Sequence, residues 1–276
     1  MTTLHLPGSV VSVSWLLENL SHPNLVVLDA SIAPYSGHKR RIPGARLFDI
    51  DGVFSNPASS LPHTMPSITD FERNVRELGI NQDSAIVAYD AFGIYSSPRA
   101  WWMFRAMGFK NIAILDGGLP AWQEAGLTLE PAGEDTYQPG DFLAHPAENS
   151  FTDIQQVIVD LQNPEVAVVD ARSRERFAGT APEPRAGMRG GHMPGAFNLP
   201  FTEVQNEQHL LLSVDELQAK WKETIGERRR IVTSCGSGVT ACVLALTAEL
   251  AGYTDVKVYD GSWSEWGRPG DLPVIS

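Results

Sequence analysis

Residues 231–240 read IVTSCGSGVT. A β-branched run ends at Cys235, a glycine-rich turn follows, and a helical pattern begins near Val239. This order predicts a buried parallel strand that carries the cysteine at its carboxyl end, because short β-branched runs bounded by glycine are typical of such strands. In open α/β sheets, ligands bind at the carboxyl ends of the parallel strands. The segment therefore predicts both an α/β fold and the place of a functional site.

The chain contains this pattern twice. Four segments of the first half recur in the second half in the same order. The matched pairs are 25–30 (LVVLDA) with 166–171 (VAVVDA), 42–45 (IPGA) with 193–196 (MPGA), 86–90 (IVAYD) with 231–235 (IVTSC), and 112–122 (IAILDGGLPAW) with 256–266 (VKVYDGSWSEW). The β-branched runs alternate with helical patterns, so each copy is predicted to form a parallel sheet flanked by helices.

The two copies predict two domains, at 1–130 and 151–276, joined by a linker at 131–150 that is rich in proline, glycine and charge. Asp29 and the matched Asp170 are 141 positions apart, whereas Pro43 and the matched Pro194 are 151 positions apart. The second copy therefore has ten additional residues between its aspartate and its proline. Loops such as this one often carry function. The insertion region contains Arg174, Arg176, Arg185 and Arg189. The first copy has six additional residues before its central strand, in a region with Asp51, Ser59, Ser60 and His63.

Charge and composition exclude several classes of protein. Lysine and arginine total 21 against 33 acidic residues, a net charge of −12, so the overall field repels nucleic acid and anionic membranes. We find no apolar run of about 20 residues, which a membrane span needs, and the N-terminus lacks the pattern of a secretory signal. We therefore expect a cytoplasmic protein. Cys235 and Cys242 would lie about two helical turns apart, too far for a disulfide.

Cys235 is the candidate nucleophile. The N–H groups of the turn and the start of the following helix can point at one centre and stabilise a thiolate or a bound anion. Gly236 and Gly238 permit the tight curvature that such a turn needs. A cysteine at a strand end can instead be a small core residue, which is the interpretation favoured for Cys242. The first copy has Asp90 at the matched position, so only the second copy carries the sulfur nucleophile.

The duplicated pattern, the loop CGSGVT at 235–240 and the segment VYDGSWSEWG at 258–267 resemble the tandem rhodanese family, in particular the 3-mercaptopyruvate sulfurtransferases. The resemblance implies two tandem rhodanese-like domains, the first non-catalytic and the second catalytic. It implies an enzyme that moves sulfur from 3-mercaptopyruvate to a thiol such as thioredoxin, or to cyanide, through a persulfide on Cys235, with release of pyruvate. No metal or organic cofactor is expected.

The resemblance also implies roles for individual residues. Arg176 and Arg185 match substrate-binding arginines, and a proposed proton relay would consist of Asp51, His63 and Ser237. Loop residues expected to contact the substrate are Gly236, Gly238, Val239 and Thr240. From the residues alone, His63 could equally be a loop histidine and Asp51 a turn residue. Arg174 and Arg189 are expected to form surface ion pairs or solvated charges.

Three alternatives remain open. Thiosulfate-using relatives tend to have basic residues directly after the cysteine, where this chain has Gly236 and Ser237, but a thiosulfate:cyanide sulfurtransferase is the nearest alternative. A non-catalytic binding module is the second, and the Asp90 copy illustrates it. A cysteine-based phosphatase is the third, although it needs an arginine where Ala241 and Cys242 follow the loop.

Overall fold

A computed structural model describes residues 4–34, 39–133, 135–147 and 150–276. It divides the chain into two compact units. The first unit contains residues 1–58, 65–148 and 207–211, and the second contains residues 59–64, 149–206 and 212–276. Each unit is thus made of several stretches of the chain. The domain and linker ranges given above stay a prediction. The predicted domain and linker ranges also include residues 1–3, 35–38, 134, 148 and 149, which lie outside the described residues.

The first unit is built on a five-stranded parallel sheet with the order β1-β6-β5-β2-β4. Its strands are β1 (Val10–Val11), β2 (Leu25–Asp29), β4 (Arg46–Leu47), β5 (Ala85–Tyr89) and β6 (Ile112–Leu115). A separate antiparallel pair is formed by β3 (Arg40–Arg41) and β7 (Glu130–Pro131). Its helices are α1 (Val13–Asn19), α2 (Ile68–Glu77), α3 (Ser97–Ala106) and α4 (Gly118–Glu124).

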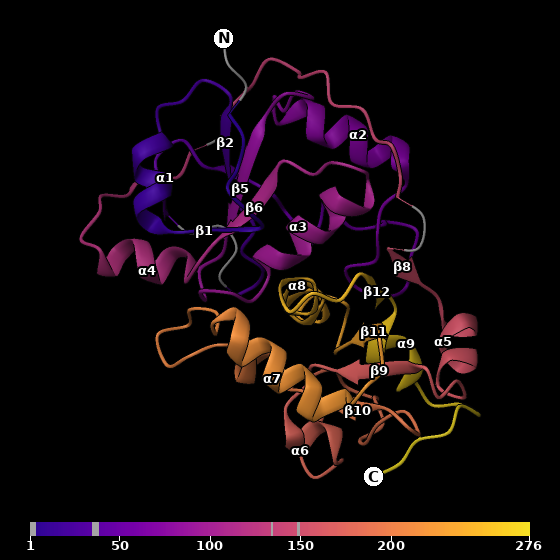
Figure 1. Cartoon of the computed structure of the whole chain (residues 1–276). Coiled ribbons are helices and arrows are strands. Elements are labelled where there is room, and N and C mark those ends of the chain that lie inside the picture. The colour runs from indigo at the N-terminus through magenta and orange to yellow at the C-terminus, as the bar shows by residue number, and fades with distance from the viewer. Residues whose placement is uncertain (1–3, 35–38, 134, 148–149) are drawn as a thin grey trace. The chain divides into compact units, whose positions relative to one another are not determined.

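Helices cover both faces of this sheet. Figure 1 shows α1 and α4 on one side of it and α2 and α3 on the other. On the first side, Leu16 and Trp122 pack in one core cluster with Val87 and Tyr89 of β5. On the second side, Phe71 of α2 and Phe104 of α3 have ring centroids 5.2 Å apart. Both faces are buried, as the continuous apolar runs of the strands predict.

The second unit repeats this topology. Its parallel sheet has the order β10-β9-β11-β12-β8, the same order as in the first unit when the matched strands are compared. The strands are β8 (Phe151–Thr152), β9 (Val166–Asp170), β10 (Phe197–Asn198), β11 (Arg230–Ser234) and β12 (Asp255–Tyr259). The helices are α5 (Ile154–Asp160), α6 (Arg174–Phe177), η1 (Phe201–Val204), α7 (Val214–Ile225), α8 (Ala241–Leu250) and α9 (Ser262–Trp266).

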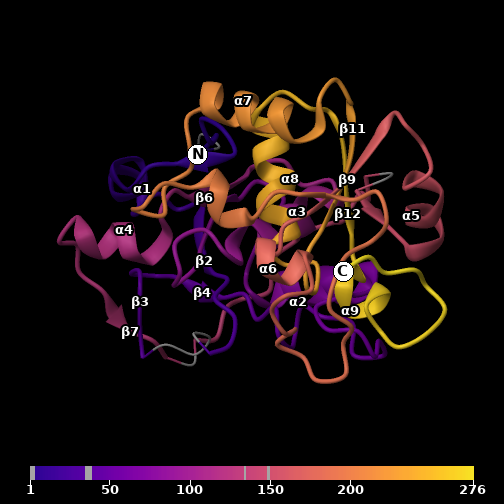
Figure 2. The same cartoon turned by 90° about the horizontal axis from the view of Figure 1, so that it is seen from below.

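Figure 2 shows α7 and α8 on one side of β9, β11 and β12, and α5 on the other. Trp263 and Trp266 of α9 share a core cluster with Val157 of α5 and Val232 of β11. The predicted fold, two tandem α/β domains with parallel sheets flanked by helices, is confirmed. Within the described residues, no helix is both long enough and apolar enough to cross a membrane.

Candidate active site

Cys235 lies at the carboxyl end of β11, the central strand of the second sheet. The turn that follows leads to α8, which begins at Ala241, and it contains Gly238 with a positive φ of 79°. Left-handed backbone of this kind favours glycine, and it lets the chain reverse direction within a few residues. Cys235 forms no disulfide, and only 2% of its surface is exposed. The sulfur is thus placed at the edge of the sheet where parallel α/β folds bind ligands.

Helix α9 holds the backbone of this turn. The Ser262 hydroxyl accepts a hydrogen bond from the Cys235 amide at 3.1 Å, and the Trp263 amide donates to the Cys235 carbonyl at 2.9 Å. The Ser264 amide and hydroxyl both donate to the Gly236 carbonyl, at 2.8 and 2.6 Å. The main chain on both sides of the sulfur is therefore fixed by one five-residue helix.

The matched turn of the first unit shows what such a loop can bind. The buried Asp90 carboxylate accepts hydrogen bonds at 2.8–3.0 Å from four backbone amides of the turn and of the start of α3, together with the Ser97 hydroxyl at 2.7 Å. Gly93 stands three residues after Asp90, with a φ of 113°, as Gly238 stands three residues after Cys235. A turn of this sequence pattern can thus surround one anion with N–H donors.

Two arginines border the second turn. A Cβ atom added at Gly236 would lie 3.2 Å from Nη2 of Arg176 and 3.9 Å from Nη1 of Arg185. Arg176 is also bound by Glu183, with Nη2 2.6 Å from the carboxylate, and Arg185 lies 3.4 Å from the Ser264 hydroxyl. The two arginines that the resemblance predicts therefore lie against the residue that follows the cysteine, where they can bind an anionic substrate.

The sequence analysis did not find the buried ion-pair network behind Arg176. The Arg172 guanidinium lies between Asp170, at 2.6 Å, and Glu183, at 2.7 Å, and 4.1 Å from the centroid of the Trp263 ring. Burial alone would lower the pKa of Arg172, but the charges of Asp170 and Glu183 together raise it above its ordinary value. One signal was visible in the repeat, since the first copy has Ser31 where the second has Arg172.

The other two arginines of the insertion region bind the protein itself. Arg174 pairs with Glu203 at 2.8 Å on the surface. Arg189 donates to the backbone carbonyls of Leu272, at 2.7 Å, and Trp266, at 2.9 Å. Their geometry gives them structural rather than substrate contacts.

His63 belongs to the second unit, where its Nδ1 lies 2.9 Å from the Ser237 hydroxyl. Arg268, just after α9, donates to the Ser60 carbonyl at 3.0 Å and to the Ser264 carbonyl at 3.0 Å, and so ties segment 59–64 to the end of α9. Asp51 belongs to the first unit, where its carboxylate accepts from the Ala33 amide at 2.7 Å. Its part in a relay with His63 stays a prediction.

The remaining predicted loop residues, Val239 and Thr240, are buried at the start of α8. Cys242 is fully buried inside that helix, and its Sγ lies 3.3 Å from the Gly238 carbonyl, as suits a core residue. Among the described residues, no group of three or more His, Cys, Asp or Glu side chains could hold a metal ion.

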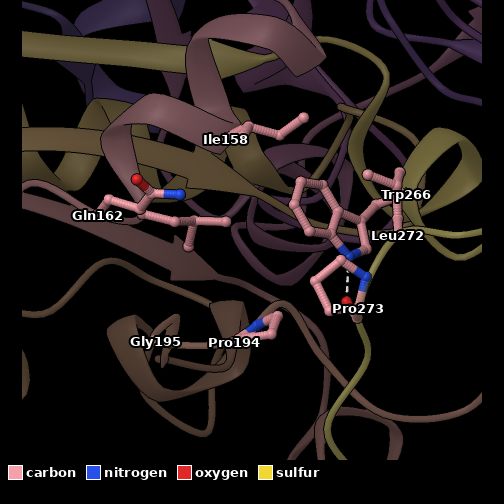
Figure 3. Close-up of a pocket in the computed structure, with 8 residues that line it drawn as sticks. Ile158, Gln162, Pro194, Gly195, Trp266, Leu272 and Pro273 are labelled. Atoms are coloured by element: carbon pink, nitrogen blue, oxygen red, sulfur yellow. Dashed lines mark hydrogen bonds between the residues drawn. The ribbon is translucent and has the colours of Figure 1, made fainter.

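A pocket of about 430 Å³ lies elsewhere in the second unit. Figure 3 shows the Trp266 indole on one wall, with its N–H donated to the Pro273 carbonyl, and the Gln162 amide on another. The rest of the lining is apolar or backbone, from Ile158, Leu161, Pro194, Gly195 and Leu272. Without a nucleophilic or titratable side chain, this pocket offers no chemistry comparable to the Cys235 turn.

Comparison with known proteins gives one family for both halves. The model of the rhodanese-like domain matches residues 12–125 and 153–268. The 3-mercaptopyruvate sulfurtransferase of Escherichia coli K12 is 38% identical over 274 residues, which is 96% of both chains. The mitochondrial thiosulfate/3-mercaptopyruvate sulfurtransferase 1 of Arabidopsis thaliana is 39% identical, over 97% of this chain and 78% of that protein. A crystal structure of a 3-mercaptopyruvate sulfotransferase from Escherichia coli matches with a TM-score of 0.81 and 36% identity, covering 94% of this chain and 100% of that one.

Proposed function

We propose a function from one premise: this chain belongs to the rhodanese family, whose domain model matches both of its halves. The proposal is that the chain is a 3-mercaptopyruvate sulfurtransferase that carries sulfur as a persulfide on Cys235. One observation carries it above the others. The cysteine turn is bordered by two guanidinium groups, while the residues that directly follow the cysteine, Gly236 and Ser237, are uncharged.

The donor has one carboxylate and a ketone, and it develops a second negative charge as its carbon–sulfur bond breaks. Arginine can bind a carboxylate through two N–H groups and can stabilise an oxyanion as it forms. Arg176 and Arg185 supply two such groups next to Gly236. Two guanidinium groups beside an uncharged turn suit a donor that has one carboxylate and that develops a second negative charge only while its carbon–sulfur bond breaks.

In the first half-reaction, the Cys235 thiolate attacks the sulfur of mercaptopyruvate. A sulfur–sulfur bond forms, the carbon–sulfur bond breaks, and its electron pair becomes the enolate of pyruvate. The enolate then takes up one proton and leaves as pyruvate. His63 and Ser237, 2.9 Å apart, are the groups proposed to deliver this proton, with Asp51 as the predicted third member of the relay.

In the second half-reaction, an acceptor attacks the outer sulfur of the persulfide, and the Cys235 thiolate leaves. Thiols, including reduced thioredoxin, and cyanide are the proposed acceptors. The turn amides can stabilise a negative charge on the Cys235 thiolate and on the Cys235 persulfide. Four amides of the matched turn bind the Asp90 carboxylate of the first unit in the same way. A cytoplasmic location remains a prediction.

Intact-protein mass spectrometry tests the covalent intermediate. After exposure to mercaptopyruvate without an acceptor, we expect a mass gain of one sulfur, about 32 Da, because the persulfide cannot be discharged. The gain should vanish in Cys235→Ser and persist in the matched control Cys242→Ser, which changes a buried helix residue. A gain that persists in Cys235→Ser would contradict the proposal.

The nearest alternative is a thiosulfate:cyanide sulfurtransferase, since one relative carries both donors in its name. Steady-state kinetics with each donor on the same preparation separate the two functions. We expect kcat/KM for mercaptopyruvate to exceed that for thiosulfate, because no basic residue directly follows Cys235 to bind a doubly charged donor. A clear preference for thiosulfate would replace the proposed donor and leave the persulfide mechanism intact.

A further inference from the structure

Ser262, the first residue of α9, has a backbone conformation that serine rarely adopts. Its φ is 48°, in the left-handed region, and its side chain is fully buried. The matched residue of the first unit is Gly118, with a φ of 53°. The match follows from the hydrogen bonds, because Leu119 donates to the Asp90 carbonyl and Trp263 donates to the Cys235 carbonyl. Glycine adopts this conformation without a steric penalty, whereas a side chain is disfavoured there.

The two units differ in what the neighbouring turn allows. A Cβ atom added at Gly118 would collide with the backbone carbonyls of Gly93 and Asp90. In the second unit the Ser262 side chain occupies this side of the backbone, so the Cys235 turn leaves room for a hydroxyl that the Asp90 turn does not. In this chain, the serine thus stands in the copy that carries Cys235, and glycine stands in the copy that carries Asp90.

The Ser262 hydroxyl joins two backbone groups. It donates its single proton to the Tyr259 carbonyl at 2.8 Å, and it accepts the Cys235 N–H at 3.1 Å. The first bond orients the oxygen, which leaves a lone pair for the amide. The amide of a residue lies one bond from its Cα, so this contact restricts the direction in which the cysteine side chain leaves the backbone.

We propose that Ser262 is a positioning residue for the nucleophile: its hydroxyl holds the Cys235 amide so that the sulfur faces the substrate arginines and the remaining turn amides. The hydroxyl acts through the backbone of the cysteine. This inference rests on the proposed function for its turnover measurement, but the reactivity of Cys235 can be measured without any sulfur donor.

The decisive variant is Ser262→Gly, because glycine removes the hydroxyl and relieves the left-handed strain, as Gly118 does in the first unit. In a Cys242→Ser background, we expect alkylation of Cys235 by iodoacetamide to slow about tenfold. We also expect kcat for mercaptopyruvate to fall about 10- to 100-fold, since small misplacements of reacting groups have effects of this size. KM should change less than about twofold, because Arg176 and Arg185 keep their places. The melting temperature should stay close to that of the parent protein, because relief of the left-handed strain offsets the loss of the two hydrogen bonds of the hydroxyl.

Ser262→Ala provides the second arm, because it lacks the hydroxyl but keeps the left-handed strain. It should show the same kinetic losses as the glycine variant with a lower melting temperature. Parent-like alkylation and kcat in the glycine variant would overturn the inference. So would loss of the folded state in that variant, since the hydroxyl would then serve stability instead of the cysteine. If the parent protein does not turn over mercaptopyruvate, the proposed function fails, and the alkylation rates still decide the role of Ser262.

Discussion

Glu183 holds Arg176, one of the two arginines proposed to bind the substrate. Its side chain is only 4% exposed, and its two oxygens bind Arg172 at 2.7 Å and Arg176 at 2.6 Å. Arg172 is fully buried and has Asp170 as its other carboxylate partner. Two carboxylates and two guanidinium groups therefore balance one another, and Arg185 supplies the further positive charge that is proposed to bind the anionic donor. Glu183 is thus a structural carboxylate that orders the Arg176 side chain.

We expect Glu183→Gln to raise KM for mercaptopyruvate about tenfold while kcat changes less. A free arginine side chain has about 2 kcal/mol of rotamer entropy, and the amide keeps only part of the ordering contact. The variant should also lose about 3 kcal/mol of unfolding free energy, because Arg172 loses one of its two buried charge partners. Steady-state kinetics and urea denaturation measure the two effects.

Glu203→Gln is the matched control for this variant, because Glu203 pairs with Arg174 at the surface. Surface ion pairs contribute little to stability, so we expect parent-like KM and stability. If Glu183→Gln left KM at the parent value, the ordering role assigned to this carboxylate would be wrong.

At the scale of secondary-structure elements, helix α9 and Arg268, two residues after its end, organise the site. Ser262 and Ser264 hold the backbone of Cys235 and Gly236, and Arg268 ties the end of the helix to Ser60. Segment 59–64 carries His63, so the proposed proton donor depends on this last contact. The helix thus contacts the backbone of Cys235, the proposed nucleophile, at one end and the His63 segment at the other.

Arg268→Ala should separate these two tasks. We expect kcat to fall about tenfold, because His63 is less well ordered against Ser237 and general acid catalysis of this kind typically contributes 10²- to 10⁴-fold. The rate of Cys235 alkylation should not change, since the Ser262 contact remains. Arg230→Ala, which removes an exposed pair with Asp255, is the control and should alter neither rate. An equal loss of alkylation and turnover would contradict this division of tasks.

Local patterns in the sequence were sufficient for the strands, the two parallel sheets and the position of Cys235, because each depends on neighbouring residues. Contacts between distant segments were not visible. The Ser262 hydroxyl reaches Cys235 from 27 positions away, and the order of β11 and β12 in the sheet decides that contact. The 174 positions between His63 and Ser237 could be bridged only through resemblance to a family.

At the scale of the whole molecule, one topology is used twice with different chemistry at matched positions. Asp90 stands where the second copy has Cys235, and Gly118 stands where it has Ser262. In the first copy, the Asp90 carboxylate accepts hydrogen bonds from the amides of its own turn. Gly118 adopts its left-handed conformation without a side chain that must form hydrogen bonds. The turn of the first copy thus binds a carboxylate of the chain itself, whereas the matched turn of the second copy carries Cys235, the proposed nucleophile.

Asp90→Asn tests this reading of the first copy. An asparagine would turn an NH₂ group toward donors that now bind a carboxylate, namely the amides of Phe92, Tyr95, Ser96 and Ser97. Hydrogen bonds to buried charged groups contribute about 1.5–3 kcal/mol, so we expect the unfolding free energy to fall by about 3 kcal/mol. Asp83→Asn, at an exposed position, should leave it unchanged. The kcat and KM of folded Asp90→Asn protein should match the parent, since the carboxylate stabilises its own turn and has no part in sulfur transfer. A variant with parent-like stability but reduced kcat would instead assign Asp90 to the reaction, and the separation of scaffold and catalytic copies would be wrong.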